Sequence, residues 1–470
     1  MSYNSDVRQN IATLEFGKFV EIVDDTRFPA TSVVRVQYPD DASMPTVTSV
    51  ETYPKYAVTT YISNSSIPVA LASSSSLDAF GRLRTSAPLT LFDSSHRYRD
   101  NSLWCSVTAA GASCNFNPHQ GLVDLTVDTL SGSSVVRETI KVFSYQPGKS
   151  LQILNTFVMA PSADDVVQRV GYYGQENGMY FQLSGSVAGF GMRSKVSGSV
   201  VDTVVPMSAW NGDRMDGTGA SGVVLDVTKA QIMWMDVEWL GVGTVRMGFV
   251  YNGQFVVCHS FHHANFASST YITTASLPVR YEIFNTNTTS ASRTMKQICT
   301  TVVSEGGYEL RGNQLSVGTA IASPKVLTLA STFYPAVTIR LKSTRLDAVV
   351  IPSAISLMPV TNGAFYNWKL IMGGTTTGGS GTWLDVHADS SVEYRLDATG
   401  ITGGRVIASG FLQGSNQGSP PLDVLKDALF RFQLERNGLT STAYELSLVV
   451  STNNAGSPVY GAIDWEEISR

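Results

Sequence analysis

The chain has 470 residues, a formal net charge of −5 at pH 7 and 15% charged residues. A single hydrophobic core stops growing beyond roughly 250–300 residues, so this length predicts more than one domain. Lys and Arg are scattered along the chain, which disfavours nucleic-acid binding, because phosphate neutralisation needs a clustered basic face. No stretch approaches ~18 uninterrupted apolar residues, so no membrane span is expected. The abundance of Ser, Thr, Gly, Val and aromatic residues predicts an all-β chain.

Residues 1–77 are predicted to form an extended N-terminal arm. The segments 32–38 and 57–62 have extended character, and the polar run 73–76 suits a linker. Prolines interrupt the arm and keep its strands short, because proline removes a donor from the strand ladder. The start of the chain lacks the basic and apolar pattern of a secretion signal. We therefore expect the arm to gain order by lying against another surface.

Arg82 and Arg84 follow the arm and are two residues apart. On an extended chain both guanidinium groups leave the same face, while Leu83 enters the other. The pair is suited to clamp carboxylates of a neighbouring subunit. The alternative is two solvated charges on a surface strand, which contribute little to stability.

Residues 78–308 are predicted to form a jelly-roll β-sandwich of the lectin or glucanase type. Extended, mostly apolar runs recur there at the spacing of sandwich strands. The expected strands are 122–127, 135–143, 150–159, 178–183, 231–240, 245–251, 254–261, 277–284 and 296–304. The strands 231–240 and 245–251 read as a hairpin, with turns at 241–243 and at Asn252-Gly253.

A second β-sandwich is predicted over residues 309–470. Its expected strands are 325–329, 337–341, 346–351, 354–358, 367–372, 392–396 and 444–450. The Gly/Thr/Ser run 373–381 is predicted to be a loop, and it lacks the lysine that follows a phosphate-binding loop. Residues 422–429 are expected to form one short helix after Pro420-Pro421.

Trp234, Asp236 and Glu238 alternate along one predicted strand and therefore share a face. Two carboxylates so placed resemble part of the pattern used in retaining glycoside hydrolysis, but the next position on that face is Leu240. Trp234 is a candidate to line a glycan groove with some of the tyrosines 172, 173 and 180. The alternative places the acids on the solvated face of a sheet whose other face carries Met233, Met235, Val237 and Trp239, and places the aromatic side chains in the core.

Two further clusters contain side chains that bind metals. Cys258, His259, His262 and His263 alternate between strand faces, so no three converge, and no metal site is predicted there. Trp210 and three acids, Asp213, Asp216 and Asp226, surround a Gly-rich loop whose oxygens suit calcium, although hydrogen bonds within the loop are the favoured reading. The four cysteines, Cys105, Cys114, Cys258 and Cys299, are expected to be reduced thiols. No cofactor and no nucleophilic catalytic arrangement is predicted.

Several long segments of the chain resemble the sequences of a family of virion structural proteins from tailed phages, especially marine and cyanobacterial phages. They lie at 78–84, 92–104, 121–123, 141–150, 168–174, 210–253 and 277–282. Members of the family are similar to tail fibres, fibre adaptors or proteins that decorate the head. The resemblance implies a virion protein that is not an enzyme.

The expected function is therefore a tail-associated fibre or fibre adaptor that assembles as a closed homo-oligomer, such as a trimer. Residues 1–77 are expected to attach to the particle, with Arg82 and Arg84 in contact with a partner subunit. Other virion proteins of the tail, neck or capsid are the expected partners. The alternatives are a capsid decoration or head-fibre protein, and a module that binds host surface glycan near Trp234, Asp236 and Glu238.

Overall fold

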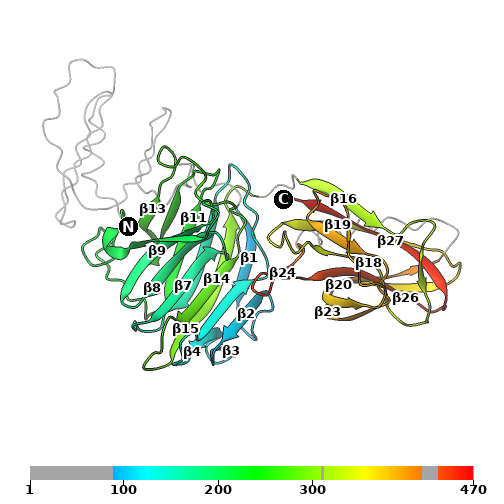
Figure 1. The fold of residues 1–470 in the computed structure, drawn as a ribbon, viewed down its shortest axis with the longest axis horizontal. Coiled ribbons are helices and arrows are strands. Elements are labelled where there is room, and N and C mark those ends of the chain that lie inside the picture. The colour runs from blue at the N-terminus through cyan, green and yellow to red at the C-terminus, as the bar shows by residue number, and fades with distance from the viewer. Residues whose placement is uncertain (1–87, 308–311, 415–431, 469–470) are drawn as a thin grey trace, which may run out of the picture. The chain divides into compact units, whose positions relative to one another are not determined.

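The computed structural model describes residues 88–307, 312–414 and 432–468, which are built almost entirely from β-strands (Figure 1). The chain is all-β, as predicted, with a jelly-roll sandwich followed by a second β-sandwich. The predicted arm and the predicted helix at 422–429 lie outside the described residues. In the part of the chain that is described, no helix has both the length and the apolar character needed to cross a membrane.

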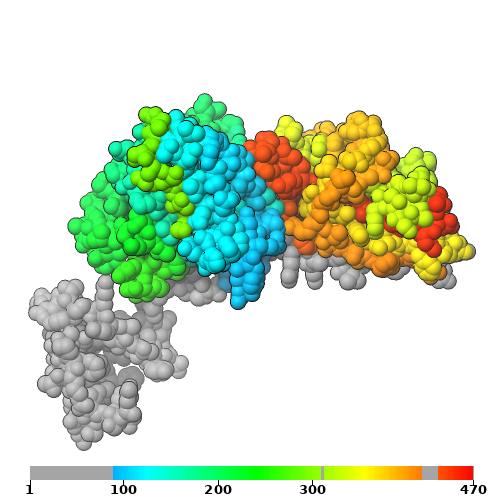
Figure 2. Space-filling view, turned by 90° about the horizontal axis from the view of Figure 1, so that it is seen from below, coloured from blue at the N-terminus to red at the C-terminus, as the bar shows by residue number. Residues whose placement is uncertain are grey.

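The jelly roll consists of two antiparallel sheets that pack face to face. One sheet has eight strands, and strands distant in sequence are neighbours in it. Its order is β13 (Gln254–Phe261), β12 (Val245–Tyr251), β11 (Gln231–Val237), β6 (Leu151–Val158), β15 (Arg293–Ser304), β4 (Leu122–Val127) and β3 (Ser113–Asn117), and β1 (Leu89–Ser95) also pairs with β15. Figure 2 shows the blue and cyan residues of the early strands beside the yellow-green residues of the late ones.

The other sheet of the jelly roll has seven strands. Its order is β10 (Val201–Pro206), β9 (Val187–Ser194), β8 (Gly178–Ser184), β7 (Val166–Tyr173), β14 (Val279–Asn285), β5 (Ser134–Thr139) and β2 (Trp104–Ala109). A single turn of 3-10 helix, η2 (Met207–Ala209), follows β10.

The core between the two sheets follows from the alternation of side chains along each strand. Along β6, Leu151, Ile153, Asn155 and Phe157 are buried, whereas the residues that alternate with them are partly exposed. Phe157 meets Phe181 of the opposite sheet, and Phe181 in turn contacts Phe249 edge to face, with ring centroids 5.3 Å apart. Edge-to-face packing of this kind adds to the stabilisation from burial of the rings, because ring edges and faces carry opposite partial charge.

The hairpin predicted from residues 231–251 is confirmed. β11 and β12 pair in antiparallel register, with Val237 opposite Val245. The next turn, between β12 and β13, holds Asn252 at φ 48° and Gly253 at φ 76°. Left-handed backbone at both positions is what a two-residue type I′ turn requires, and Asn-Gly is the sequence that adopts it most readily.

The second sandwich also pairs two sheets, and a small two-stranded ribbon, β24 (Arg436–Asn437) and β25 (Thr442–Ala443), accompanies them. Its smaller sheet has the order β16 (Asn313–Gly318), β27 (Ser457–Glu467) and β17 (Lys325–Leu327), with β19 (Val350–Pro359) also on β27. Its larger sheet has the order β21 (Leu384–Asp385), β22 (Val392–Arg395), β18 (Tyr334–Leu341), β26 (Glu445–Thr452), β20 (Phe365–Thr377) and β23 (Gly400–Gln413).

The predicted loop at 373–381 is partly wrong. Residues 374–377 continue β20 and pair with β23, and the chain turns beyond Thr377. Gly373, at φ 71°, sits where the register of β20 against β26 shifts, and Gly374 follows it. A glycine at such an irregularity lets a strand bend and continue, so a Gly-rich run did not mark the end of this strand.

A buried histidine near β1 gives the fold a pH-dependent stability. His96 is 1% exposed, and burial first, with the charge of Arg137 second, lowers its pKa to about 4. Between pH 6.5 and 4 the imidazole of His96 binds a proton in the unfolded chain but not in the folded chain, so the free energy of unfolding falls as the pH falls through this window. A shift of this size corresponds to about 3 kcal/mol.

We expect His96→Gln to remove most of this loss. The measurement is the free energy of urea unfolding at pH 7 and at pH 4, with the exposed His119→Gln as the matched control. The wild type and the control should lose more stability on acidification than His96→Gln does. Equal losses in all three proteins would show that His96 is not the titrating group.

Candidate functional site

The side chains predicted to form a glycan groove are not open to solvent. Trp234 is fully buried on β11, and its ring lies above Gly248, where a Cβ atom would come within 3.0 Å of the indole nitrogen. The indole donates a hydrogen bond to the carbonyl of Val256 at 3.2 Å, and the ring packs edge-on against Phe255. A buried ring cannot stack on a sugar, so the prediction of a glycan groove here is corrected.

The two acids beside Trp234 are also engaged within the protein. Asp236 is fully buried and accepts a 2.8 Å hydrogen bond from Nε of Arg246, its cross-strand neighbour on β12. Glu238 lies beyond the end of β11 and accepts a hydrogen bond from the backbone of Thr244 at 3.2 Å. The alternative, acids on a solvated sheet face, is therefore wrong for Asp236. Its apolar half is confirmed, since Met233, Met235 and Val237 are core residues.

The tyrosines considered as groove partners of Trp234 belong to the opposite sheet. Tyr172 points into the core, where its hydroxyl donates to the carbonyls of Phe143 and Ala275. Tyr173 and Tyr180 lie on β7 and β8 of the seven-stranded sheet, whereas Trp234 is in the eight-stranded sheet. The sequence reveals which residues share a strand face, but it does not reveal which strands share a sheet.

The histidines near the end of β13 serve packing and hydrogen bonding. His263 stacks on Tyr271 with ring centroids 3.9 Å apart, and its Nδ1 lies 2.6 Å from the carbonyl of Gly243. Cys258 is buried in the core, and burial raises its pKa to about 12. Among the described residues, no three His, Cys, Asp or Glu side chains are grouped as metal ligands would be. All four cysteines are free thiols, as expected.

The acidic loop after Trp210 satisfies its own carboxylates, in agreement with the favoured prediction. Asp213 accepts hydrogen bonds from the backbones of Met215 at 2.8 Å and Ser221 at 2.6 Å. Asp216 and Asp226 each accept from the threonine two residues ahead, through its backbone and its hydroxyl. Trp210 stacks on Phe190 in the core. Arg82 and Arg84 lie outside the described residues.

A dense polar layer covers the outer face of the seven-stranded sheet. We call it the Arg–Tyr face, and it comprises Arg169, Tyr173, Tyr180, Gln182, Arg193, Asp202 and Glu282. These residues alternate with core residues along β7, β8, β9, β10 and β14, which places them on the side away from the core. Charged side chains at alternate positions of several strands were the sequence signal for this face, and sequence reasoning missed it.

Guanidinium groups cover the two tyrosine rings of the Arg–Tyr face. Arg169 lies 4.9 Å from the centre of the Tyr180 ring, and Arg193 lies 5.5 Å from that of Tyr173. The ring of Tyr180 approaches the sheet closely because Gly191 lies beneath it, where a Cβ atom would come within 2.4 Å of the ring. Cations over aromatic faces are attracted by the ring quadrupole, so this stacking stabilises the layer.

The carboxylates of the Arg–Tyr face are paired with its cations. Arg193 binds Asp202 through two hydrogen bonds of 2.8 and 2.9 Å, and Tyr173 donates to Glu282 at 3.0 Å. Burial opposes ionisation of Asp202, but the hydrogen bonds and charge of Arg193 lower its pKa. A general acid needs the opposite, a carboxyl group that retains its proton near neutral pH. Asp202 is thus suited to hold structure and not to donate a proton.

A second ionic group lies at the edge of this face and joins the two sandwiches. We call it the junction cluster, and it comprises Glu138, Arg280, Asp347 and Arg436. Glu138 is 1% exposed and accepts hydrogen bonds from Arg280, its cross-strand neighbour, at 2.8 Å and from Arg436 of β24 at 2.6 Å. Arg436 also donates to Asp347 at 3.1 Å. The carboxylate of Glu138 therefore sits between two buried guanidinium groups.

Two neutral hydrogen bonds support the same junction. Gln433 donates to the carbonyl of Val142 at 3.0 Å, and Gln175 donates to that of Gly438 at 2.8 Å. Burial opposes the charge of Arg436, but Glu138 and Asp347 raise its pKa, so it remains a cation. Buried ions with several fixed partners tolerate little displacement, so the geometry of the contacts at the junction is tightly defined.

Comparison with known proteins gives no family for this chain. No family model matches it, and no curated protein does. Among solved structures it is similar to a protein of unknown function from Shewanella oneidensis MR-1, with a TM-score of 0.32, 11% identity, and coverage of 52% of this chain and 100% of that one.

Two further solved structures are similar at the same low level. One is a mixed-linkage glucan GH16 protein of Bacteroides ovatus, with a TM-score of 0.31, 11% identity, and coverage of 45% of this chain and 99% of that one. The other is the CBM2 module of the evolved Dit of Lactobacillus casei BL23 phage J-1, with a TM-score of 0.29, 9% identity, and coverage of 47% and 98%. At these scores the similarities carry no argument about function.

Proposed function

We propose that this chain is a structural component of a tailed-phage virion, specifically a tail-associated fibre or fibre-adaptor protein that assembles as a homo-oligomer and is not an enzyme. The observation that carries the proposal is the junction cluster. The buried ion pair of Glu138 with Arg436 links one sandwich to the next, and Arg280 of the first sandwich pairs with the same carboxylate. A fixed junction suits a component that holds a defined position in a large assembly.

The sequence resemblance supports the same proposal. The segments that carry it, from residue 92 onward, fall on strands and turns of the jelly roll, including β7, the β11–β12 hairpin and β14. They occupy both sheets of one domain, so the resemblance concerns a whole folded unit. The Arg–Tyr face supports the proposal that the chain is not an enzyme, because its acids and cations pair with each other.

The proposal predicts that the chain is a stoichiometric part of purified phage particles. The measurement is quantitative mass spectrometry of gradient-purified particles of the phage that encodes it, with the major capsid protein as internal standard. We expect a constant, low copy number per particle that is a multiple of the oligomer size. Loss of the chain from particles during purification, while the tail proteins remain, would contradict the proposal.

Light scattering of the purified full-length chain tests the homo-oligomer separately. A closed oligomer has one mass over a wide range of concentration, and a trimer is the expected state. Capsid decoration and head-fibre roles are the alternatives, and they predict a copy number that follows the capsid lattice.

A further inference from the structure

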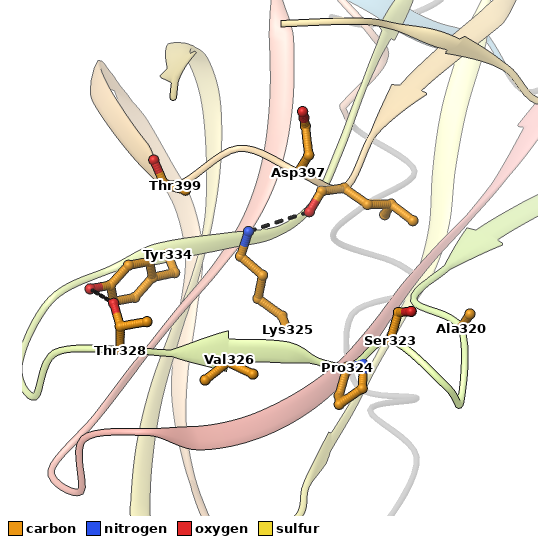
Figure 3. A pocket seen from close by; sticks show the side chains of 10 residues that line it. Ala320, Ser323, Pro324, Lys325, Val326, Thr328, Tyr334, Asp397 and Thr399 are labelled. Atoms are coloured by element: carbon orange, nitrogen blue, oxygen red, sulfur yellow. Dashed lines mark hydrogen bonds between the residues drawn. The ribbon is translucent and has the colours of Figure 1, made fainter. Parts of the chain in front are cut away.

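A pocket in the second sandwich contains a half-buried lysine whose ammonium group donates to backbone carbonyls. The pocket has a volume of about 490 Å³, and β17, the start of β18 and the chain after β22 line it (Figure 3). This volume falls in the range of pockets that bind small molecules, roughly 300–1,000 Å³. Lys325 reaches into it from β17.

The ammonium group of Lys325 is held by backbone carbonyls. It donates to the carbonyl of Leu396 at 3.3 Å and to that of Ala398. Within the described residues no carboxylate lies within salt-bridge distance of it, and one of its three N–H donors has no hydrogen-bond acceptor. Burial lowers the pKa of Lys325, which reflects the cost of holding a charge away from water.

The acid of the pocket lining, Asp397, forms its hydrogen bonds with residues other than Lys325. Asp397 accepts hydrogen bonds from Nε of Arg395 at 2.7 Å and from the hydroxyl of Ser380 at 2.7 Å. In Figure 3 its carboxylate points away from the ammonium group of Lys325. Those hydrogen bonds hold the pKa of Asp397 well below its usual range, so it stays an anion paired with Arg395. The charge of Asp397 raises the pKa of Lys325 against the effect of burial, but Asp397 forms no salt bridge with it, so one N–H donor of the ammonium group is left for an incoming anion.

The rest of the lining on the side of Lys325 includes hydroxyl groups. Thr328 and Tyr334 share a hydrogen bond of 2.7 Å between their hydroxyls. Pro324 and Val326 also line the pocket, but Val326 follows Lys325 on β17 and points to the opposite side of the strand (Figure 3). Hydroxyls that accept and donate beside an ammonium group suit a ligand that carries both hydroxyls and a carboxylate.

We propose that this pocket binds a small carboxylate-bearing sugar, of the size of a hexuronic acid, with its carboxylate on the ammonium group of Lys325. The carboxylate accepts a hydrogen bond from the third N–H of the lysine, and the hydroxyls of the ring face those of Thr328 and Tyr334. The site is in the second sandwich, away from the first-sandwich residues considered from the sequence, and it binds whether or not the chain is a virion component.

Ligand-observed NMR and calorimetric titration of the full-length chain test this proposal. The probes are D-glucuronate, D-glucose and inorganic phosphate. We expect glucuronate to bind with a Kd on the order of 1 mM. Glucose, which keeps the ring and lacks the charge, should bind at least about tenfold more weakly, as expected when a charged hydrogen bond is lost.

Two variants separate ligand binding from folding. Lys325→Met keeps the stem and removes the charge, and it should weaken glucuronate binding at least about tenfold. Thr328→Val leaves the lysine and its two carbonyl bonds in place and removes a hydroxyl of the lining, so it should also weaken glucuronate binding. Lys296→Met removes a charge that is paired with Asp124 in the other sandwich and should leave binding unchanged.

Three results would overturn the proposal. The first is no detectable binding of glucuronate by the folded chain. The second is phosphate binding as tight as that of glucuronate, which would show a general anion site that does not recognise the ring. The third is glucuronate binding that is not weakened in Lys325→Met or not weakened in Thr328→Val, which would place the sugar elsewhere.

Discussion

Replacing Glu138 by alanine is expected to lower the free energy of unfolding by about 3–5 kcal/mol. Glu138 lies between the guanidinium groups of Arg280 and Arg436, which are 5% and 3% exposed. Removal of the carboxylate leaves the buried Arg280 without this ion-pair partner and leaves Arg436 with Asp347, and the cost of a buried charge that has lost its partner far exceeds that of a lost surface pair. Urea unfolding at pH 7 measures the change.

The matched control is Glu176→Ala, which breaks the ion pair with Lys195. That pair is exposed, 52% for the acid and 39% for the lysine, and solvated pairs contribute about 0–1 kcal/mol. A double-mutant cycle of Glu138→Ala with Arg436→Met adds a second readout. We expect a coupling of at least about 1 kcal/mol, since removing the cation relieves the unpaired charge. Equal losses in the Glu138 and Glu176 variants would contradict a buried junction cluster.

Replacing Trp234 by alanine is expected to cost about 3–5 kcal/mol of stability. Its ring is fully buried against Phe255 and the backbone of Gly248, and its N–H is bonded to Val256. The alanine variant leaves a cavity that the surrounding strands cannot close, and it leaves the carbonyl of Val256 without the indole donor. Urea unfolding, with near-ultraviolet circular dichroism as a check on packing, measures the loss.

Ile232→Ala provides the control for this prediction on the same face of β11. Ile232 is 40% exposed, so its truncation should change stability by about 0.5–1 kcal/mol. A Trp234→Ala protein that is as stable as the wild type but has lost binding to a polysaccharide would show a ligand-binding ring. Such a result would restore the glycan groove that the sequence suggested.

Much of the fold follows from local sequence patterns. Residues 245–251 and 254–261 were predicted with the bounds that β12 and β13 have, because alternation and the Asn252-Gly253 turn define both ends. Strands β7, β9, β10 and β23 were not predicted, since glycines and polar residues interrupt their apolar pattern. Gly191 of β9, for example, is required because the ring of Tyr180 packs on it, and the sequence of one strand does not show such a contact with its neighbour.

The sites were harder to predict than the strands, because they depend on pairings between distant segments. Alternation placed Trp234 and Asp236 on one face, but only the hairpin register brings Arg246 opposite Asp236. Glu138 and Arg436 are 298 positions apart, and no local pattern links them. Lys325 drew no attention in the sequence, because an isolated lysine in a strand is usually solvated, and its environment comes from the chain after β22.

The most direct test of the central claim is cryo-electron microscopy of intact particles of the phage that encodes this chain. We expect density for the two joined sandwiches on the tail or neck, in a closed ring or trimer, with the junction of Glu138 and Arg436 resolved in every copy. Density distributed over the capsid lattice would contradict the tail-fibre or adaptor assignment and would make the chain a head decoration protein.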